Sequence, residues 1–334
     1  MQIKDIAKQA NVSPATVSRV LHNSGYVSKE KRELVQKVLD ELNYVPNKIA
    51  RGLKNQSTGM IGHILPSPYP NPYMARISRG VDEEAYSRGT QILTLYSYSD
   101  EKREWEFIQE LKSRMVDGII FTSPVSRENV KKAIGLGIPV VMVERSMNLQ
   151  DVDRILIDYV PASYNATRKI LDAGHKDIGY IGKQTSASYV ESQRHEGYLQ
   201  AMKDAGIEPK DQWIKFAKDY DPMSGYHLMR ELLDGEHMPT AVFIASDMFA
   251  VGALQLLYER KLRVPDDISI VGFDNTYADK LSPPLSTVSI PIEEMGRASV
   301  QIIIDRCKNV DAAFKTLTMN ATFVDRGTVK RIGI

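Results

Sequence analysis

The sequence predicts an α/β protein with a small helical unit at its N-terminus and a larger two-lobed body built on doubly wound parallel sheets. Residues 1–45 contain three short amphipathic stretches separated by residues that cap or break helices. From Met60 onward, short apolar runs alternate with helical stretches, a pattern typical of parallel sheets covered by helices. At 334 residues the chain is also too long for one ordinary hydrophobic core.

The composition is that of a globular protein, with 43% hydrophobic and 25% charged residues. No stretch approaches the roughly 18 to 20 apolar residues that a membrane span needs, and the N-terminus lacks the apolar segment of a signal peptide. The single cysteine, Cys307, excludes an intrachain disulfide, and the six histidines show no spacing typical of a metal site. We therefore expect a cytoplasmic protein with no membrane segment, no metal and no cofactor.

Charge is distributed unevenly along the chain. The net charge is only +1, yet residues 1–57 contain ten Lys and Arg against five Asp and Glu. A basic N-terminal unit on an acidic body is typical of a DNA-binding headpiece, although small N-terminal segments are often basic by chance.

The headpiece begins with a predicted helix over residues 3–10, followed by a three-residue turn. Ser13 is a good N-cap and Pro14 a good first residue for a second helix, which should run to about Leu21. Two short helices joined in this way form a helix-turn-helix unit, whose second helix enters the major groove. A third helix is predicted after Ser28, to about residue 43, with an apolar stripe that closes the bundle.

The exposed face of the second helix carries the residues that favour DNA binding over an ordinary helical bundle. Thr16 and Ser18 are small hydrogen-bond donors suited to phosphate oxygens, and Arg19 has the fork-shaped guanidinium that suits a guanine edge. The alternative is that Arg19 is simply a solvated surface residue.

Two runs in this region, VSPATVSRVL and LNYVPNKIARGL, make the chain resemble the lactose-repressor/galactose-repressor (LacI/GalR) family of transcription regulators, and the resemblance covers essentially the whole chain. It implies that Pro14, Ala15 and Arg19 read bases, and that residues 46–55, within the hinge and linker 46–58, form a hinge helix that folds on the minor groove. In that hinge Leu53 would be the wedge between base pairs. The alternative is a linker with no role of its own. The implied DNA-binding residues are Ser13, Pro14, Ala15, Thr16, Ser18, Arg19, Asn23, Tyr44, Asn47, Ala50 and Leu53.

The body, residues 59–334, shows eight strand candidates, which are more than one doubly wound domain usually contains. They are residues 60–65, 91–96, 118–122, 140–143, 155–157, 178–181, 241–244 and 268–272. The resemblance implies two lobes like those of a periplasmic sugar-binding protein. One lobe is expected at about 59–157 and 289–318, and the other at about 158–288 and 319–334.

Ligands of open α/β sheets bind beyond the carboxyl ends of the strands, which places the predicted ligand site between the lobes. Asp158, Asp247 and Asp274 follow predicted strands, and Arg194 opens a predicted helix. Carboxylates, an arginine and tyrosine rings suit a polyhydroxylated ligand, although Asp247 could merely cap a helix and Asp158 hold a turn. By the resemblance, the effector contacts fall on Tyr73, Asp158, Arg194, Tyr220, Asp247 and Asp274.

The predicted function is therefore a transcription regulator, most simply a repressor, that binds pseudo-palindromic operator DNA as a homodimer under the control of a small molecule. The expected effector is a sugar, a sugar phosphate or a nucleoside. Met74 and Ser246 depart from residues common in sugar-responsive members of the family, and they leave the effector's identity open. The alternatives are a sugar-binding protein and a cytosolic sugar-processing enzyme that uses the cleft carboxylates.

Overall fold

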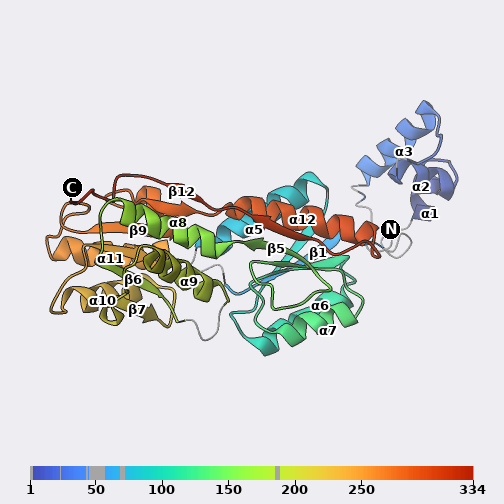
Figure 1. Ribbon diagram of the computed structural model, residues 1–334. Helices are drawn as coiled ribbons and strands as arrows, with labels where there is room; N and C mark the ends of the chain where they lie inside the picture. The colour runs from blue at the N-terminus through green and yellow to red at the C-terminus, as the bar shows by residue number, and fades with distance from the viewer. Residues whose placement is uncertain are drawn as a thin grey trace. The chain divides into compact units, whose positions relative to one another are not determined.

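The computed structural model describes residues 3–22, 24–42, 44, 57–67, 72–184 and 189–333, and the chain divides into two compact units, Met1–Thr58 and Gly59–Ile334 (Figure 1). An α/β fold with two parallel-sheet lobes and an N-terminal helix-turn-helix region is confirmed. The predicted hinge, residues 46–58, lies outside the described residues as far as residue 56.

The first unit is a three-helix bundle of α1 (Ile3–Gln9), α2 (Pro14–His22) and α3 (Lys29–Glu41). Ser13 caps α2 as the sequence predicts, because its hydroxyl accepts a hydrogen bond from the Thr16 backbone N–H at 3.2 Å. The three helices bury a small apolar core contributed by Ile6, Ala7, Ala10, Val17, Val20, Val35, Val38 and Leu39.

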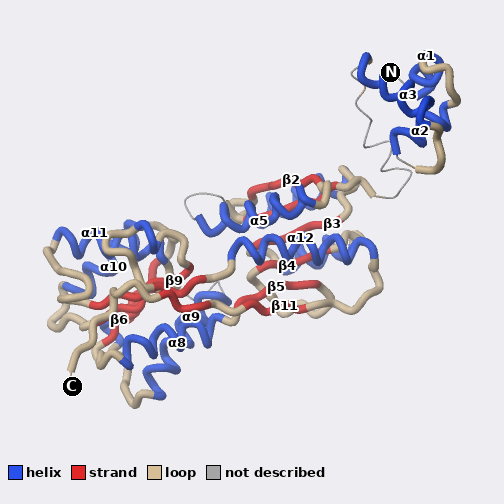
Figure 2. The backbone as a smooth tube through the Cα atoms, turned by 90° about the horizontal axis from the view of Figure 1, so that it is seen from above, coloured by secondary structure: helices blue, strands red, loops and turns tan. Residues whose placement is uncertain are grey.

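The first lobe of the second unit contains a six-stranded parallel sheet in the order β11-β5-β4-β3-β1-β2. Its strands are β1 (Met60–Leu65), β2 (Gln91–Tyr96), β3 (Gly118–Thr122), β4 (Val140–Val143), β5 (Asp153–Ile157) and β11 (Thr316–Met319). Helices α5 (Pro72–Ser87) and α12 (Ile292–Lys308) pack together on one face (Figure 2). Helices α6 (Glu101–Ser113) and α7 (Arg127–Gly135) contribute to the separate apolar core on the other face.

The second lobe repeats this arrangement with a sheet in the order β12-β10-β9-β8-β6-β7, in which only β12 is antiparallel. Its strands are β6 (Ile178–Lys183), β7 (Ile214–Ala217), β8 (Ala241–Ile244), β9 (Ser269–Asp274), β10 (Thr287–Ser289) and β12 (Thr322–Val324). Helix α8 (Tyr159–Asp172) packs against α9 (Tyr189–Asp204), and α10 (Pro222–Leu233) packs against α11 (Asp247–Glu259). Two short 3-10 helices, Asp211–Trp213 and Ala278–Lys280, complete the lobe.

Four strands escaped the sequence analysis: β7, β10, β11 and β12. Each has only three or four residues, and three of the four residues of β11 are exposed. Such strands lack the continuous apolar run by which a buried strand is recognised. They form because a neighbouring strand offers them a ladder of backbone hydrogen bonds, which is a property of the assembled sheet.

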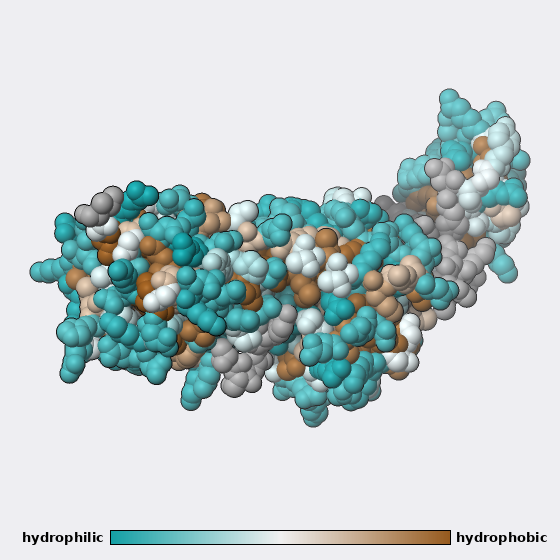
Figure 3. All heavy atoms as spheres, in the orientation of Figure 1, coloured by the Kyte–Doolittle hydropathy of each residue, from teal (hydrophilic) through white to brown (hydrophobic). Residues whose placement is uncertain are grey.

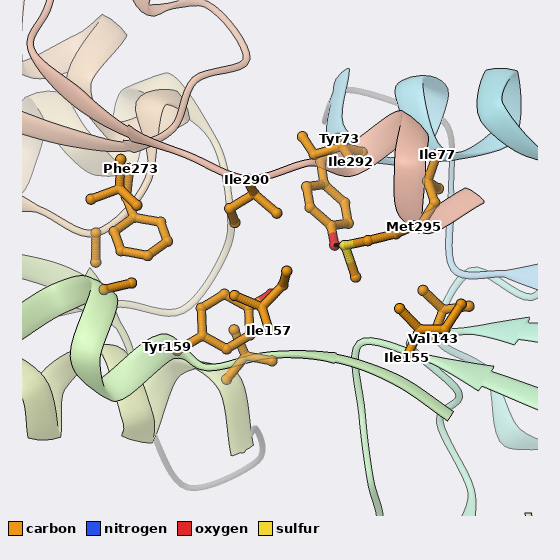
Figure 4. Close-up of a cluster of buried hydrophobic side chains, with 14 of the residues drawn as sticks. Tyr73, Ile77, Val143, Ile155, Ile157, Tyr159, Phe273, Ile290, Ile292 and Met295 are labelled. Carbon is orange, nitrogen blue, oxygen red and sulfur yellow. Dashed lines mark hydrogen bonds between the residues drawn. The ribbon is translucent and has the colours of Figure 1, made fainter. Parts of the chain in front are cut away.

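Three segments of the chain pass between the lobes: those after β5, after β10 and after β11. The first two carry buried apolar side chains: Ile157 and Tyr159 on either side of the exposed Asp158, and Ile290 after β10 (Figure 4). They belong to one hydrophobic cluster that extends through both lobes. Burial of this shared apolar surface holds the two lobes together.

No helix among the described residues is long and apolar enough to cross a membrane. The face drawn in Figure 3 is mostly hydrophilic, with apolar residues scattered between charged ones.

The contact between α5 and α12 depends on glycine at position 80. A Cβ atom placed on Gly80 would overlap the backbone carbonyl of Glu293, and backbone cannot move aside as a flexible side chain can. We predict that Gly80→Ala lowers the free energy of unfolding by about 1 to 3 kcal/mol through overpacking. Gly135→Ala, at the end of α7 with open space around it, is the matched control and should be neutral or slightly stabilising. Urea denaturation of the three proteins measures the difference; equal midpoints would contradict the close packing.

Candidate functional site

The first unit presents one side of α2 to solvent. Val17 and Val20 are buried against the bundle, whereas Pro14, Ala15 and Arg19 are exposed, and Thr16 and Ser18 are half-buried. This division follows from the 3.6-residue period of the helix. An exposed helix face bearing a guanidinium and two hydroxyls can contact phosphates and base edges.

The remaining predicted DNA-binding residues divide into two groups. Tyr44 is described and packs, half-buried, against the core of the first unit. Asn23, Asn47, Ala50 and Leu53 lie outside the described residues, so the predicted hinge contacts stay predictions.

A cavity of about 620 Å³ lies between the two lobes of the second unit. Its volume is in the range typical of small-molecule sites. It opens at the carboxyl ends of strands from both sheets, as expected for parallel α/β folds. The lining residues are Pro66, Ser67, Tyr73, Met74, Ser99, Ser123, Val125, Glu144 and Arg145 from the first lobe and Lys183, Gln184, Val190, Glu191, Arg194, Asp219, Tyr220 and Asp274 from the second.

Arg194 is the buried cation at the centre of this wall, with 3% of its surface exposed. Its guanidinium donates to Asp274 Oδ1 at 2.8 Å and to the Ala245 carbonyl. The rings of Tyr159 and Phe273 lie 4.9 and 4.3 Å from its central carbon. These contacts hold the guanidinium plane rigidly, so that its Nε–H has a fixed direction.

Glu191 lies one helical turn before Arg194 on α9 and is also buried. Its Oε1 accepts a short hydrogen bond from the Tyr220 hydroxyl. The Lys183 ammonium lies 4.7 Å from the centre of the Tyr220 ring. Burial, together with the negative charge of Glu191, raises the pKa of the Tyr220 hydroxyl well above its usual range, so Tyr220 stays a neutral donor.

Glu144 is the buried carboxyl that the first lobe contributes to the cavity lining, and it follows β4 directly. Among the described residues it forms no salt bridge, and the Tyr159 hydroxyl approaches its Oε1 at only 3.4 Å. Burial raises the pKa of Glu144 to about 7, despite the opposing charges of Arg145 and Arg194. At neutral pH this carboxyl is therefore present in both its charged and its neutral form.

Besides Ser99, whose φ is 58°, three cavity residues at strand ends have left-handed backbone conformations that side-chain-bearing residues rarely adopt. Ser123, Glu144 and Asp274 have φ values of 48°, 78° and 98°. Each lies at or just after the carboxyl end of a strand, β3, β4 or β9. Backbone strain of this kind is retained where the surroundings enforce it, often at functional sites.

Four buried polar atoms of the cavity residues have no hydrogen-bond partner within the described part of the chain. They are Ser123 Oγ, Arg145 Nε, Glu191 Oε2 and Arg194 Nε. Leaving such groups unsatisfied costs about 1 to 3 kcal/mol each, and more for charged groups. The set contains N–H donors, a carboxylate acceptor and a hydroxyl that can do both, which is the chemistry that a ligand rich in hydroxyls would satisfy.

Of the six predicted effector residues, the structure brings Tyr73, Arg194, Tyr220 and Asp274 together around the cavity. Asp247 does not line it: the side chain is fully buried and accepts hydrogen bonds from the backbone N–H groups of Thr276 and Tyr277 and from the Thr287 hydroxyl. Asp158 does not line it either, but is exposed on the segment before α8.

The sequence analysis missed Ser123, Glu144 and Glu191. The first two follow β3 and β4, so the rule that selected Asp274 would also have selected them. Glu191 lies three residues before Arg194, at a spacing that places both on one helix face. Its presence in the wall could have been inferred once Arg194 was chosen.

Comparison with known families agrees with both parts of the chain. Residues 2–47 match the family described as bacterial regulatory proteins, lacI family, and residues 167–329 match a periplasmic binding protein-like domain. Among curated proteins, the chain is 35% identical over 328 residues to the ribose operon repressor of Haemophilus influenzae, covering 98% of each. It is 31% identical over 333 residues to the transcriptional repressor PurR of Mannheimia succiniciproducens, covering 99% of each.

Solved structures show the same architecture. The lac repressor dimer bound to operator and an anti-inducer superposes with a TM-score of 0.89, at 24% identity and 99% coverage of each chain, which shows the fold. A regulator from Enterococcus faecium with bound ribose has a TM-score of 0.74 at 26% identity, and the match covers 82% of this chain and all of that one.

The raised pKa of Glu144 predicts a specific dependence of stability on pH. The folded protein holds this proton up to about pH 7, whereas an ordinary glutamate loses it near 4.5. The contribution of Glu144 to the free energy of unfolding should therefore fall by up to about 3 kcal/mol as pH rises from 4.5 to 7. Glu144→Gln should remove that dependence.

Thermal melts of both proteins between pH 4 and 8 measure the effect. Asp247, whose pKa burial also raises to about 7, contributes to both proteins, so the difference between them is the informative quantity. Glu106→Gln, on the exposed face of α6, controls for the change in net charge. Parallel curves for the wild type and Glu144→Gln would contradict the assignment.

Proposed function

This chain belongs to the lacI family of bacterial regulatory proteins, and we propose that it represses transcription as a cytoplasmic homodimer on a pseudo-palindromic operator, under the control of a small molecule bound between its lobes. The identity to curated repressors extends over both the headpiece and the body. The chain therefore carries both a DNA-binding unit and a ligand-binding unit.

The DNA-binding proposal is supported by α2 and its basic surroundings. Arg19 is the residue we assign to direct readout of a base, and it should contribute about 1 to 3 kcal/mol of discrimination. Pro14 and Ala15 lack polar side chains, so their contribution is limited to apolar contact. Thr16 and Ser18 are assigned to phosphate contacts that position the helix.

The single observation that carries the effector proposal is the set of buried, unpartnered polar atoms around the interlobe cavity. Arg194 and Glu191 come from the second lobe and Ser123 from the first. A ligand that satisfies all three must contact both lobes, so it favours one relative position of the lobes over others. A ligand shifts a conformational equilibrium only through such a difference in affinity between states.

The cavity favours an uncharged, hydroxyl-rich effector over a phosphorylated one. Its one buried cation, Arg194, is already paired with Asp274, whereas the carboxyls of Glu144 and Glu191 have no cationic partner among the described residues. A phosphate brought between them would meet the negative charge of Glu191, and that of Glu144 whenever Glu144 is ionised, in a poorly solvated site. Arg145 and Lys183 are less buried and would only partly offset this. Similar structures contain ribose and cellobiose.

The proposed mechanism is a two-state rearrangement of the lobes about the apolar segments that connect them. In a dimer, this rearrangement changes the spacing of the two headpieces, and one spacing alone fits both half-sites of the operator. The other function considered, an enzyme acting on sugars through the cleft carboxylates, is disfavoured because the curated relatives are transcriptional repressors. Turnover of a bound sugar by the purified protein would support the enzyme function instead.

Single substitutions should impair DNA binding and ligand binding independently of each other. Arg19→Ala should abolish binding to the site recovered by in vitro selection from random DNA while preserving ligand-induced thermal stabilisation. Glu191→Gln keeps the shape of the side chain but replaces an acceptor with a donor, so it should weaken the ligand response while preserving DNA binding. Fluorescence anisotropy with labelled DNA and thermal shift measure the two properties. Loss of both properties in either variant would argue against two independent sites.

The charge argument predicts the outcome of a ligand screen. Neutral sugars and nucleosides should raise the melting temperature more than their phosphorylated counterparts at equal concentration. A ligand at 100 times its dissociation constant stabilises the folded state by about 2.7 kcal/mol, which is readily measured. Stronger stabilisation by a sugar phosphate than by the parent sugar would overturn the proposed effector class.

A further inference from the structure

A second buried carboxyl of the first lobe, Glu104, does not line the cavity but contacts a loop that does. Glu104 is in the first turns of α6 and has no exposed surface. Its Oε2 accepts from the Val125 backbone N–H at 2.8 Å, and its Oε1 accepts from the Ser126 N–H at 3.1 Å. The Asn129 side-chain amide donates to the same Oε1 at 3.2 Å. Glu104 thus holds the loop 123–126, whose residues Ser123 and Val125 line the cavity.

The second lobe has a counterpart in Asp247, at the start of α11. Its Oδ2 accepts from the backbone N–H groups of Thr276 at 2.7 Å and Tyr277 at 3.3 Å. Its Oδ1 accepts from the Thr287 hydroxyl at 3.0 Å. The held loop, 274–277, begins with Asp274, the partner of Arg194 in the cavity wall.

We infer that Glu104 and Asp247 are positioning residues for the effector site, each holding a cavity loop of its own lobe in the conformation that binds ligand. The inference rests on the proposed function. Neither carboxyl lines the cavity, so each would act through the backbone of the loop that it holds. Ser123 and Asp274 have left-handed φ values, which are costly without such support.

The alternative is that these carboxyls merely fill polar positions in the core. Both carboxyls are buried, and a carboxylate removed from water is costly to keep charged, so burial raises the pKa of Glu104 and of Asp247. Apolar residues would fill the same space at lower cost, but they could not accept hydrogen bonds from the loop N–H groups. The positions of those N–H groups are what the carboxyls determine.

Glu104 and Asp247 differ in how their two carboxyl oxygens share the loop N–H groups, and this difference can be tested. At Glu104 the two backbone N–H groups point to different oxygens, so in Glu104→Gln one of them must face the amide N–H₂. At Asp247 both point to the same oxygen, so Asp247→Asn can retain both. The Thr287 hydroxyl can then rotate to accept from the new amide. The same carboxyl-to-amide change should therefore disrupt one loop and spare the other.

Hydrogen exchange read at single amides tests this in the full-length protein. Exchange at Val125 and Ser126 should be about tenfold faster or more in Glu104→Gln and Glu104→Ala, because a hydrogen bond to a charged acceptor is lost. Exchange at Thr276 and Tyr277 should be comparably faster in Asp247→Ala but within about twofold of the wild type in Asp247→Asn. Glu110→Gln, on the exposed side of α6, is the matched control and should resemble the wild type.

Calorimetry with D-ribose as the probe gives the functional readout. Affinity should fall about tenfold in Glu104→Gln and stay within about twofold in Asp247→Asn, following the loss or retention of the loop hydrogen bonds. The inference is overturned if exchange at Val125 and Ser126 is unchanged in Glu104→Gln, if protection is lost throughout the lobe, or if ribose affinity is unaffected while exchange increases. If the wild type does not bind ribose, ribose is excluded as effector, and the exchange pattern still decides the role of the two carboxyls.

Discussion

The ion pair between Arg194 and Asp274 is the interaction on which the ligand site depends. Both residues are almost fully buried, and removing two charges from water is costly unless their geometry and hydrogen bonds are well satisfied. Here the guanidinium also meets a backbone carbonyl and the faces of Tyr159 and Phe273, and Asp274 accepts a second hydrogen bond from Ser246 at 2.9 Å. The pair joins the end of β9 to α9, so this wall of the cavity is held by contacts within its own lobe.

The loop that begins with Asp274 also contacts the first lobe. Arg76 of α5, in the first lobe, donates to the carbonyl of Asn275, the residue after Asp274, at 2.8 Å. Arg76 also forms a two-pronged ion pair with Glu293 of α12, at 2.7 and 2.8 Å. The cavity wall of one lobe is thereby linked to the helix pair of the other through a short polar path.

The expectation that cavity-lining residues follow the carboxyl ends of the strands, here called the strand-end rule, was correct for Asp274 and wrong for Asp247. It selected Asp274 because a residue at the carboxyl end of a central parallel strand faces the ligand crevice. It also selected Asp247, whose side chain turns away from the crevice to meet the backbone N–H groups of the neighbouring loop. The rule places a residue at the correct edge of the sheet, but the side-chain direction depends on which hydrogen-bond donors the next loop presents. That loop lies 29 residues away from Asp247 in the chain, and no local pattern contains it.

The features that depend on local chemistry could be predicted from the order of the residues. These are the capped second helix of the headpiece, the basic charge of the N-terminal unit and the central strands of both sheets, because capping, charge and apolar runs act over a few neighbouring residues. The tertiary structure alone decided which short strands complete the sheets, that Glu144 and Glu191 join the cavity, and that Asp247 supports a loop instead of facing ligand. Each of these depends on groups distant in the chain, whose proximity and burial exist only once the lobes have folded.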